Sequence, residues 1–98
     1  MHTFTLPIDK AAFEISPDMK LIIELEDELG SLPDFYARLL NNRWKLCELV
    51  SFYHIALSQH HATPDYLQLG DRLLSSDIHT YQQQALTLLG NIFSGVKP

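Results

Sequence analysis

The chain has 98 residues and a formal net charge of −5, from twelve acidic and seven basic side chains. This length is typical of a single domain, here residues 1–98, that buries a core without metals or disulfides. Nucleic acids and anionic membranes attract clustered Lys and Arg, so the acidic balance argues against both as main partners. No apolar run approaches the ~20 residues of a membrane span, and the N-terminus does not resemble a signal peptide. We therefore expect a cytoplasmic protein.

Cys47 is the only cysteine, so no internal disulfide can form, which suits a reducing compartment. Its neighbours Leu46 and Leu49 are apolar, and free cysteine is among the most buried residue types. We expect Cys47 to be a buried structural thiol.

Residues 1–16 favour extended structure. Thr3–Leu6 are β-formers with some alternation, and Pro7 is expected to stop the run. Ala12–Ile15 could form a second short strand after an Asp9-Lys10 turn. Because a lone hairpin is only marginally stable, it has to pack on helices or pair with another chain. The expected packing residues are Phe4, Leu6, Phe13 and Ile15.

The sequence pattern of residues 17–93 predicts about five short helices in a compact bundle, followed by a tail at 94–98. The fold class is therefore mainly all-α. Ser16 and Pro17 are expected to open the first helix and Gly30 to end it. In the second helix, Pro33 takes the first position and Asn41-Asn42 form the end.

The third helix is expected from about Arg43 to His60, the fourth after a Thr63-Pro64-Asp65 cap, and the fifth from Ile78 to about Phe93. In the fourth helix, Gly70 weakens the helical pattern. In the fifth helix, we expect the Gln82-Gln83-Gln84 run to face solvent.

The segment Trp44–Leu57 is the organising helix, because ten of its fourteen residues are apolar or aromatic. On a helical wheel, most of its apolar side chains share one continuous arc, which predicts a face that packs toward the core. Large apolar side chains also lie on the other half, namely Trp44, Phe52 and Ile55. Such a helix is either central in its domain or partly covered by a partner.

The search for chemistry gives mostly negative results. The four glycines do not form a phosphate-binding loop, and no GxSxG motif is present. His54, His60 and His61 lack the i,i+3 or i,i+4 spacing of paired metal ligands on a helix. We expect no enzyme activity, no cofactor and no metal.

A resemblance to a known family rests on several short motifs. They are Leu25-Glu26 with Leu29-Gly30, Ser31-Leu32-Pro33, Phe35-Tyr36-Ala37-Arg38-Leu39, Trp44 and Leu88-Leu89. In this pattern the chain resembles the small phage tail assembly chaperones of gene transfer agents and related siphophages. The resemblance covers residues 13–60 closely and residues 61–93 more loosely.

This resemblance implies a non-catalytic phage or prophage chaperone. Such proteins bind the apolar helical tape measure protein, and also contact the tail tube protein, before the tail polymerises. On this view Trp44, Phe52 and Ile55 would line a groove for the partner helix. The acidic residues Glu24, Asp27 and Glu28 of the first helix would form its rim.

Two other classes of function remain open. The chain could be another phage or mobile-element component, such as a ring-forming connector, which would be a homo-oligomer. It could also be a bacterial regulatory or adaptor domain that binds a protein unrelated to phage.

Overall fold

The fold consists of a two-stranded antiparallel hairpin followed by five helices, which confirms the predicted fold class. The computed structural model describes residues 4–8, 11–58 and 65–93. The elements are β1 (Phe4–Ile8), β2 (Ala11–Ile15), α1 (Met19–Leu29), α2 (Leu32–Leu40), α3 (Leu46–Leu57), α4 (Tyr66–Leu74) and α5 (Ile78–Phe93).

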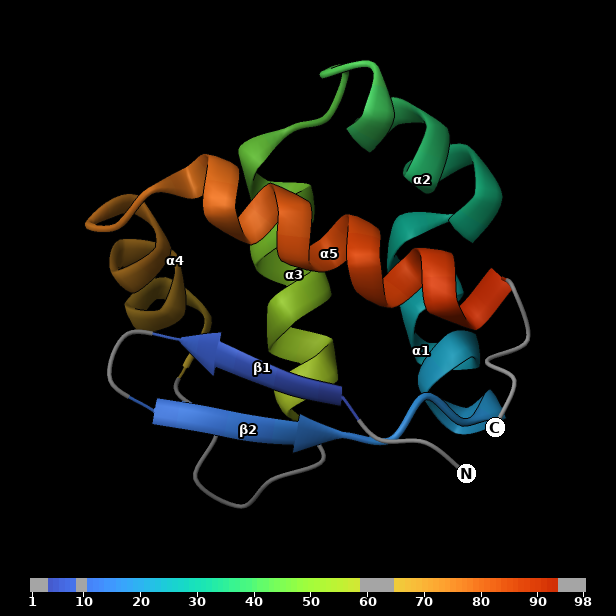
Figure 1. Ribbon diagram of the computed structural model, residues 1–98, viewed down its shortest axis with the longest axis horizontal. Helices are drawn as coiled ribbons and strands as arrows, with labels where there is room; N and C mark the ends of the chain where they lie inside the picture. Colours follow the sequence, from blue (N-terminus) through green and yellow to red (C-terminus); the bar gives the residue numbers. More distant parts are fainter. Residues whose placement is uncertain (1–3, 9–10, 59–64, 94–98) are drawn as a thin grey trace.

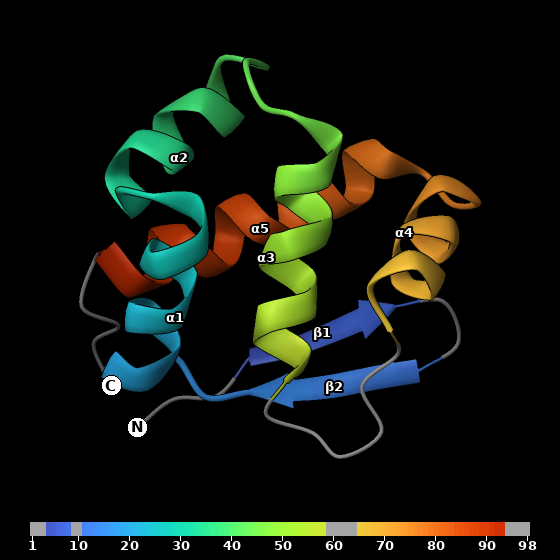
Figure 2. The same cartoon turned by 180° about the vertical axis from the view of Figure 1, so that it is seen from behind.

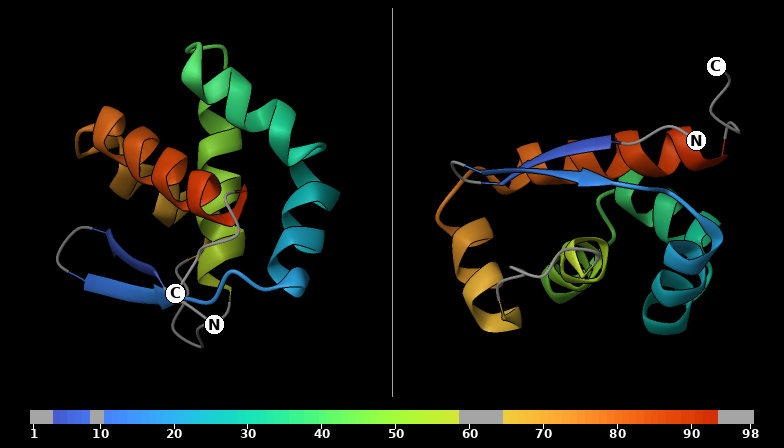
Figure 3. Two further views of the ribbon diagram at one scale, coloured as in Figure 1. Left: turned by 45° about the vertical axis from the view of Figure 1, so that its right-hand side comes forward. Right: turned by 90° about the horizontal axis from the view of Figure 1, so that it is seen from below.

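The helices and the hairpin form two layers (Figures 1 and 2). One layer holds α1, α3 and α4, with α3 in the middle and the other two helices on either side of it. The second layer holds α5 and the hairpin, which cover α3 from the same side, as the view from below shows (Figure 3). Helix α2 packs against α1 and α5.

Helix α3 is the centre of the core, as its apolar pattern predicted. Seven of its twelve residues are buried, among them Phe52 and Tyr53. The Tyr53 hydroxyl donates to the Tyr81 carbonyl oxygen at 2.7 Å and lies 3.2 Å from Gln84 Oε1. Burial, with a smaller effect of Tyr81, raises the pKa of Tyr53 above its usual range. A neutral phenol therefore links α3 to α5.

The hairpin packs on the helices, as expected for so small a sheet. Leu6, Ile8 and Ile15 are buried and Phe13 is partly buried, whereas the side chain of Phe4 lies outside the described residues. The expectation that Pro7 ends the first strand is wrong, because Pro7 pairs with Ala12 inside the ladder. A two-stranded ribbon consists only of edge strands, where proline is tolerated.

Local capping signals decide where most helices begin and end. At the end of α1, Gly30 has a φ of 80° and its N–H donates to the Glu26 carbonyl oxygen. After α2, Asn42 has a φ of 54°. Both expected helix ends are therefore confirmed. The α1 start is corrected, because Asp18 and not Ser16 is the N-cap and accepts from Leu21 N–H at 3.0 Å.

The third helix is shorter than predicted. It begins at Leu46 rather than near Arg43 and ends at Leu57, so Trp44 precedes it. For α4, Asp65 is the N-cap and accepts from Gln68 N–H, while Thr63 and Pro64 lie outside the described residues. Helix α5 has the predicted bounds.

The expectation that Gln82-Gln83-Gln84 faces solvent is wrong for two of the three side chains. Gln82 is 4% exposed and Gln84 is partly buried, while Gln83 is exposed. Gln82 Nε2 donates to the Leu39 carbonyl oxygen at 2.7 Å and to Asn42 Oδ1 at 2.8 Å. Gln82 therefore joins α5 to the end of α2 through buried hydrogen bonds.

Replacing Gln82 with Ala should lower the free energy of unfolding by about 1–3 kcal/mol, since two buried hydrogen bonds are lost. The matched control is Gln83→Ala on the exposed face of the same helix, which should change it by less than about 0.5 kcal/mol. Urea unfolding followed by circular dichroism measures both. Equal effects of the two changes would contradict a structural role for Gln82.

Candidate functional site

The predicted groove residues around α3 do not form a surface together. Phe52 is fully buried and packs its ring 6.2 Å from that of Phe35, so the expectation that it lines a groove is wrong. A face of α3 that seemed exposed from the sequence is covered by other helices. Trp44 and Ile55 are half-buried and pack against the hydrophobic core. Their role in partner binding stays a prediction.

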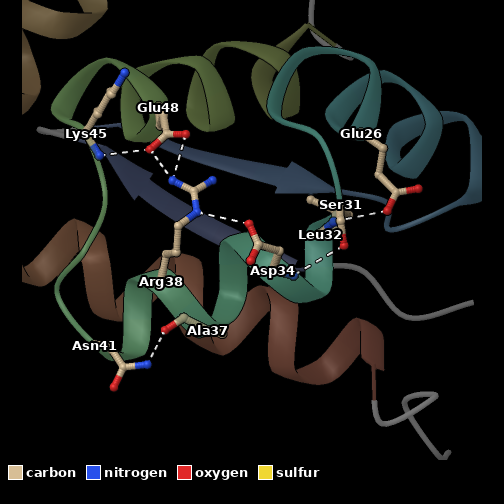
Figure 4. Close-up of polar contacts among 9 residues, drawn as sticks. All are labelled: Glu26, Ser31, Leu32, Asp34, Ala37, Arg38, Asn41, Lys45 and Glu48. Atoms are coloured by element: carbon tan, nitrogen blue, oxygen red, sulfur yellow. Dashed lines mark hydrogen bonds and ion pairs between the residues drawn. The ribbon is translucent and has the colours of Figure 1, made fainter.

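The predicted acidic rim lies on α1. Glu24, Asp27 and Glu28 are all exposed there, on the side of α3 opposite to α4 (Figures 1 and 2). Glu26, which is not among the predicted rim residues, has a structural role. Its Oε2 accepts from Leu32 N–H at 3.0 Å and so caps α2 (Figure 4).

Cys47 is exposed, so the expectation of a buried thiol is wrong. It lies in the first turn of α3, which extends beyond the region that the neighbouring helices cover. An apolar sequence neighbourhood therefore did not mean burial, because Leu46 beside it is also exposed to 38%. The exposure of both side chains indicates an open surface at the start of α3.

An apolar groove lies at this surface, between α3 and α4. Leu46, Cys47 and Val50 line it from α3. Tyr66, Leu67, Gly70, Asp71 and Leu74 line it from α4. We call this set the α3–α4 groove, and its volume is about 360 Å³. Sequence reasoning missed it because it depends on which face of α4 meets the core.

The leucines of α4 divide between the core and the groove. Leu69 and Leu73 are fully buried, whereas Leu67 and Leu74 are exposed to 76% and 59%. A side chain as apolar as leucine gains nothing from such exposure. Leu67 and Leu74 are seven residues apart, which places them on one face of the helix. They form an apolar ridge beside the groove.

Tyr66 fixes α4 against α3. Its hydroxyl donates to the Cys47 carbonyl oxygen at 2.9 Å and lies 3.2 Å from Ser51 Oγ. Its ring also meets that of His54 edge to face, with 5.7 Å between the centroids. These contacts join the two walls of the groove.

Gly70 forms the floor of the groove between Leu67 and Leu74. A Cβ atom at this position would lie 3.7 Å from both Cγ atoms of Val50, which is ordinary van der Waals contact. Core packing therefore does not require glycine here. Glycine inside a helix costs about 0.5–1 kcal/mol relative to alanine. Glycine at this lining position therefore lowers helix stability without a packing reason in the described structure.

An ion pair joins α2 to the first turn of α3. Arg38 Nη1 lies 2.7 and 2.9 Å from the two carboxylate oxygens of Glu48, and Arg38 Nε lies 3.2 Å from Asp34 Oδ2 (Figure 4). Glu48 also accepts from Lys45 N–H at 2.9 Å at the helix start. The hydrogen bond from Arg38 is the main cause that lowers the pKa of Glu48.

Polar grooves also lie between the hairpin and α5, with volumes of about 380 and 360 Å³. Their walls include Thr5 and Pro7 of β1 and Thr80, Gln83 and Gln84 of α5. Proline has no N–H to offer an added strand, so this edge is poorly suited to bind an extended peptide. The apolar α3–α4 groove is the stronger candidate for a binding site.

Within residues 4–8, 11–58 and 65–93, no group of three His, Cys, Asp or Glu side chains could hold a metal ion. His60 and His61 lie outside these ranges. None of the helices in the described part of the chain combines the length and the apolar character needed to cross a membrane.

Comparison with known proteins gives no relative for this chain, because no family model, no curated protein and no solved structure matches it significantly.

The ion pair of Glu48 should make stability depend on pH in the acid range. Since the folded-state pKa is lowered, the stabilisation is present above the unfolded value of about 4.3 and is lost as the pH falls through the folded-state value. Glu48→Gln should therefore cost about 1–2 kcal/mol at neutral pH and much less in acid.

Denaturant unfolding across this pH range measures the difference between Glu48→Gln and the unmodified protein. In an Arg38→Gln background, the same change should have a smaller effect, since the partner is already gone. An undiminished effect there would show that Arg38 is not the cause.

Gly70→Ala should raise the free energy of unfolding by about 0.5–1 kcal/mol, because the added methyl group fits and favours helix. The midpoint of thermal unfolding should rise by several degrees. The matched control is Gly30→Ala, which should destabilise, since Gly30 has a φ of 80°. A loss of stability in Gly70→Ala would show that the fold itself requires this glycine.

Proposed function

We propose that this protein is a non-catalytic assembly chaperone that binds an apolar helix of its partner in the α3–α4 groove. The partner is the tape measure protein of a phage or prophage tail, and binding occurs in the bacterial cytoplasm before the tail polymerises. The observation that supports this proposal best is an apolar groove whose lining includes the exposed Leu46, Leu67 and Leu74. The resemblance of residues 13–60 to tail assembly chaperones supplies the identity of the partner.

The dimensions of the groove suit a helix. Leu67 and Leu74 span two helical turns, which is about 10 Å along α4. An amphipathic helix presents apolar residues at i, i+3, i+4 and i+7 over the same length, and it binds hydrophobic grooves through them. Covering Leu46, Leu67 and Leu74 would remove apolar surface from water on both partners and so keep the partner soluble.

The tail tube protein is the second partner in this proposal. The exposed acidic residues Glu24, Asp27 and Glu28 of α1 lie across α3 from the groove. They therefore form a separate surface, on which a basic partner could bind while the groove is occupied. The sequence suggested a single groove with an acidic rim, whereas this proposal has two separate binding surfaces.

A ring-forming connector is the alternative function, and one observation favours it. Met19 and Ile23 of α1 are exposed to 65% and 60%, so the chain has apolar side chains on two opposite sides. Two different faces that bind each other produce head-to-tail contacts, which form a ring where the rotation between copies closes. A stable ring of the isolated protein would support this alternative.

The proposal is tested by co-expression with the protein encoded by the longest open reading frame immediately downstream. Light scattering on the purified complex should show several copies of this chain on each long partner. The double change Leu67→Gln and Leu74→Gln should abolish the complex without unfolding the protein, because both side chains are exposed.

The matched control is Met19→Gln with Ile23→Gln, which removes a similar amount of exposed apolar surface from α1. The complex should survive it. If the α1 variant loses the partner and the α4 variant keeps it, the groove is not the binding site. If the unmodified chain elutes alone and the partner stays insoluble, the chaperone function is wrong.

A further inference from the structure

The α3–α4 groove contains one charged side chain, which belongs to Asp71 in the middle of its α4 wall. Asp71 is exposed, and among residues 4–8, 11–58 and 65–93 no side chain or backbone group is hydrogen-bonded or ion-paired to its carboxylate. Its backbone oxygen accepts from Ser75, which leaves the carboxylate free to meet a ligand.

The carboxylate lies directly beside the apolar ridge. Asp71 follows Leu67 by four residues and precedes Leu74 by three, so the three side chains share one face of α4. A ligand that covers both leucines must therefore also approach the negative charge. An apolar or acidic group at that point would desolvate or repel the carboxylate, which is unfavourable.

A second copy of the chain is a poor occupant for this reason. The ridge itself suits a symmetric antiparallel pair of α4 helices, because Leu67 and Leu74 are equally far from the midpoint between Gly70 and Asp71. Leu67 of one copy would then pack on Leu74 of the other. However, both Asp71 carboxylates would lie next to the symmetry axis, where like charges repel. Each copy also carries a net charge of −5.

We infer that the occupant of the α3–α4 groove is an amphipathic helix that carries a lysine or arginine beside its apolar stripe, placed to pair with Asp71. This inference rests on the proposed function and specifies the chemistry of its partner helix. The apolar stripe supplies the affinity, and the cation selects among apolar helices and fixes the register in which the helix lies.

Two synthetic peptides of about 18 residues can test the inference, a length that gives roughly five helical turns. Both carry leucines at i, i+3, i+4 and i+7. They differ only at the positions flanking this stripe, where one peptide has lysines and the other has glutamates. Fluorescence anisotropy of the labelled peptides gives their dissociation constants for the full chain.

The lysine peptide should bind the unmodified protein about two- to fivefold more tightly than it binds the Asp71→Asn variant, which is the effect expected of an exposed ion pair. Asp71→Lys should reverse the preference in favour of the glutamate peptide. The difference between the peptides should shrink as salt is added, since exposed charges are screened. The matched control is the exposed Glu14→Lys on β2, which changes the net charge equally and should leave the order of the peptides unchanged.

Other outcomes overturn the inference in distinct ways. If both peptides bind equally and the Leu67→Gln, Leu74→Gln variant weakens both, the groove binds helices but Asp71 does not select them, and the proposed function survives. If neither peptide binds while the co-expressed partner still does, a cationic amphipathic helix is the wrong ligand class. If the chain is a dimer that this double variant dissociates, a second copy occupies the groove.

Discussion

The burial of α3 is the constraint on which the rest of the structure depends. Its side chains Phe52 and Tyr53 are too large and too apolar to face water. Helices α1 and α4 therefore flank it, and α5 and the hairpin cover it from one side. The first turn of α3 extends past this cover, which is why Leu46 and Cys47 are exposed. The groove lies where the start of α3 meets α4, and its lining on α3 includes the exposed Leu46 and Cys47.

Polar contacts keep this uncovered region ordered. The Arg38–Glu48 ion pair fixes the first turn of α3 from the side of α2, and the Tyr66 hydroxyl fixes the start of α4 to the Cys47 carbonyl oxygen. Both contacts involve groups that remain partly accessible, so each contributes modestly to stability. The Tyr66 contact joins the two walls of the groove directly, whereas the ion pair joins α3 to α2. A ligand would therefore meet a largely preformed surface and lose little free energy in ordering it.

Local chemistry made the elements predictable, whereas tertiary packing decided the details of the site. The hairpin, the stops at Gly30 and Asn42 and the bounds of α5 follow from residues adjacent in the sequence. The orientation of Gln82 could not be predicted in this way, because its partners Leu39 and Asn42 lie 43 and 40 residues away in the sequence. The exposure of Cys47 and the burial of Phe52 likewise depend on which helix covers which turn of α3. The apolar pattern identified a central helix correctly but could not show which of its faces would remain open.

Two adjacent residues of α4 connect stability with function. Gly70 weakens a helix whose packing would accept alanine, and Asp71 places beside exposed leucines a carboxylate that has no partner within the described part of the chain. Neither choice improves the folding of the isolated chain, and natural proteins tend to retain such costs where a ligand binds. A partner helix would account for both residues, because it needs close approach at Gly70 and gains register from Asp71. A partner helix would also account for the exposed Leu67 and Leu74 on either side, since it would bury their apolar surface.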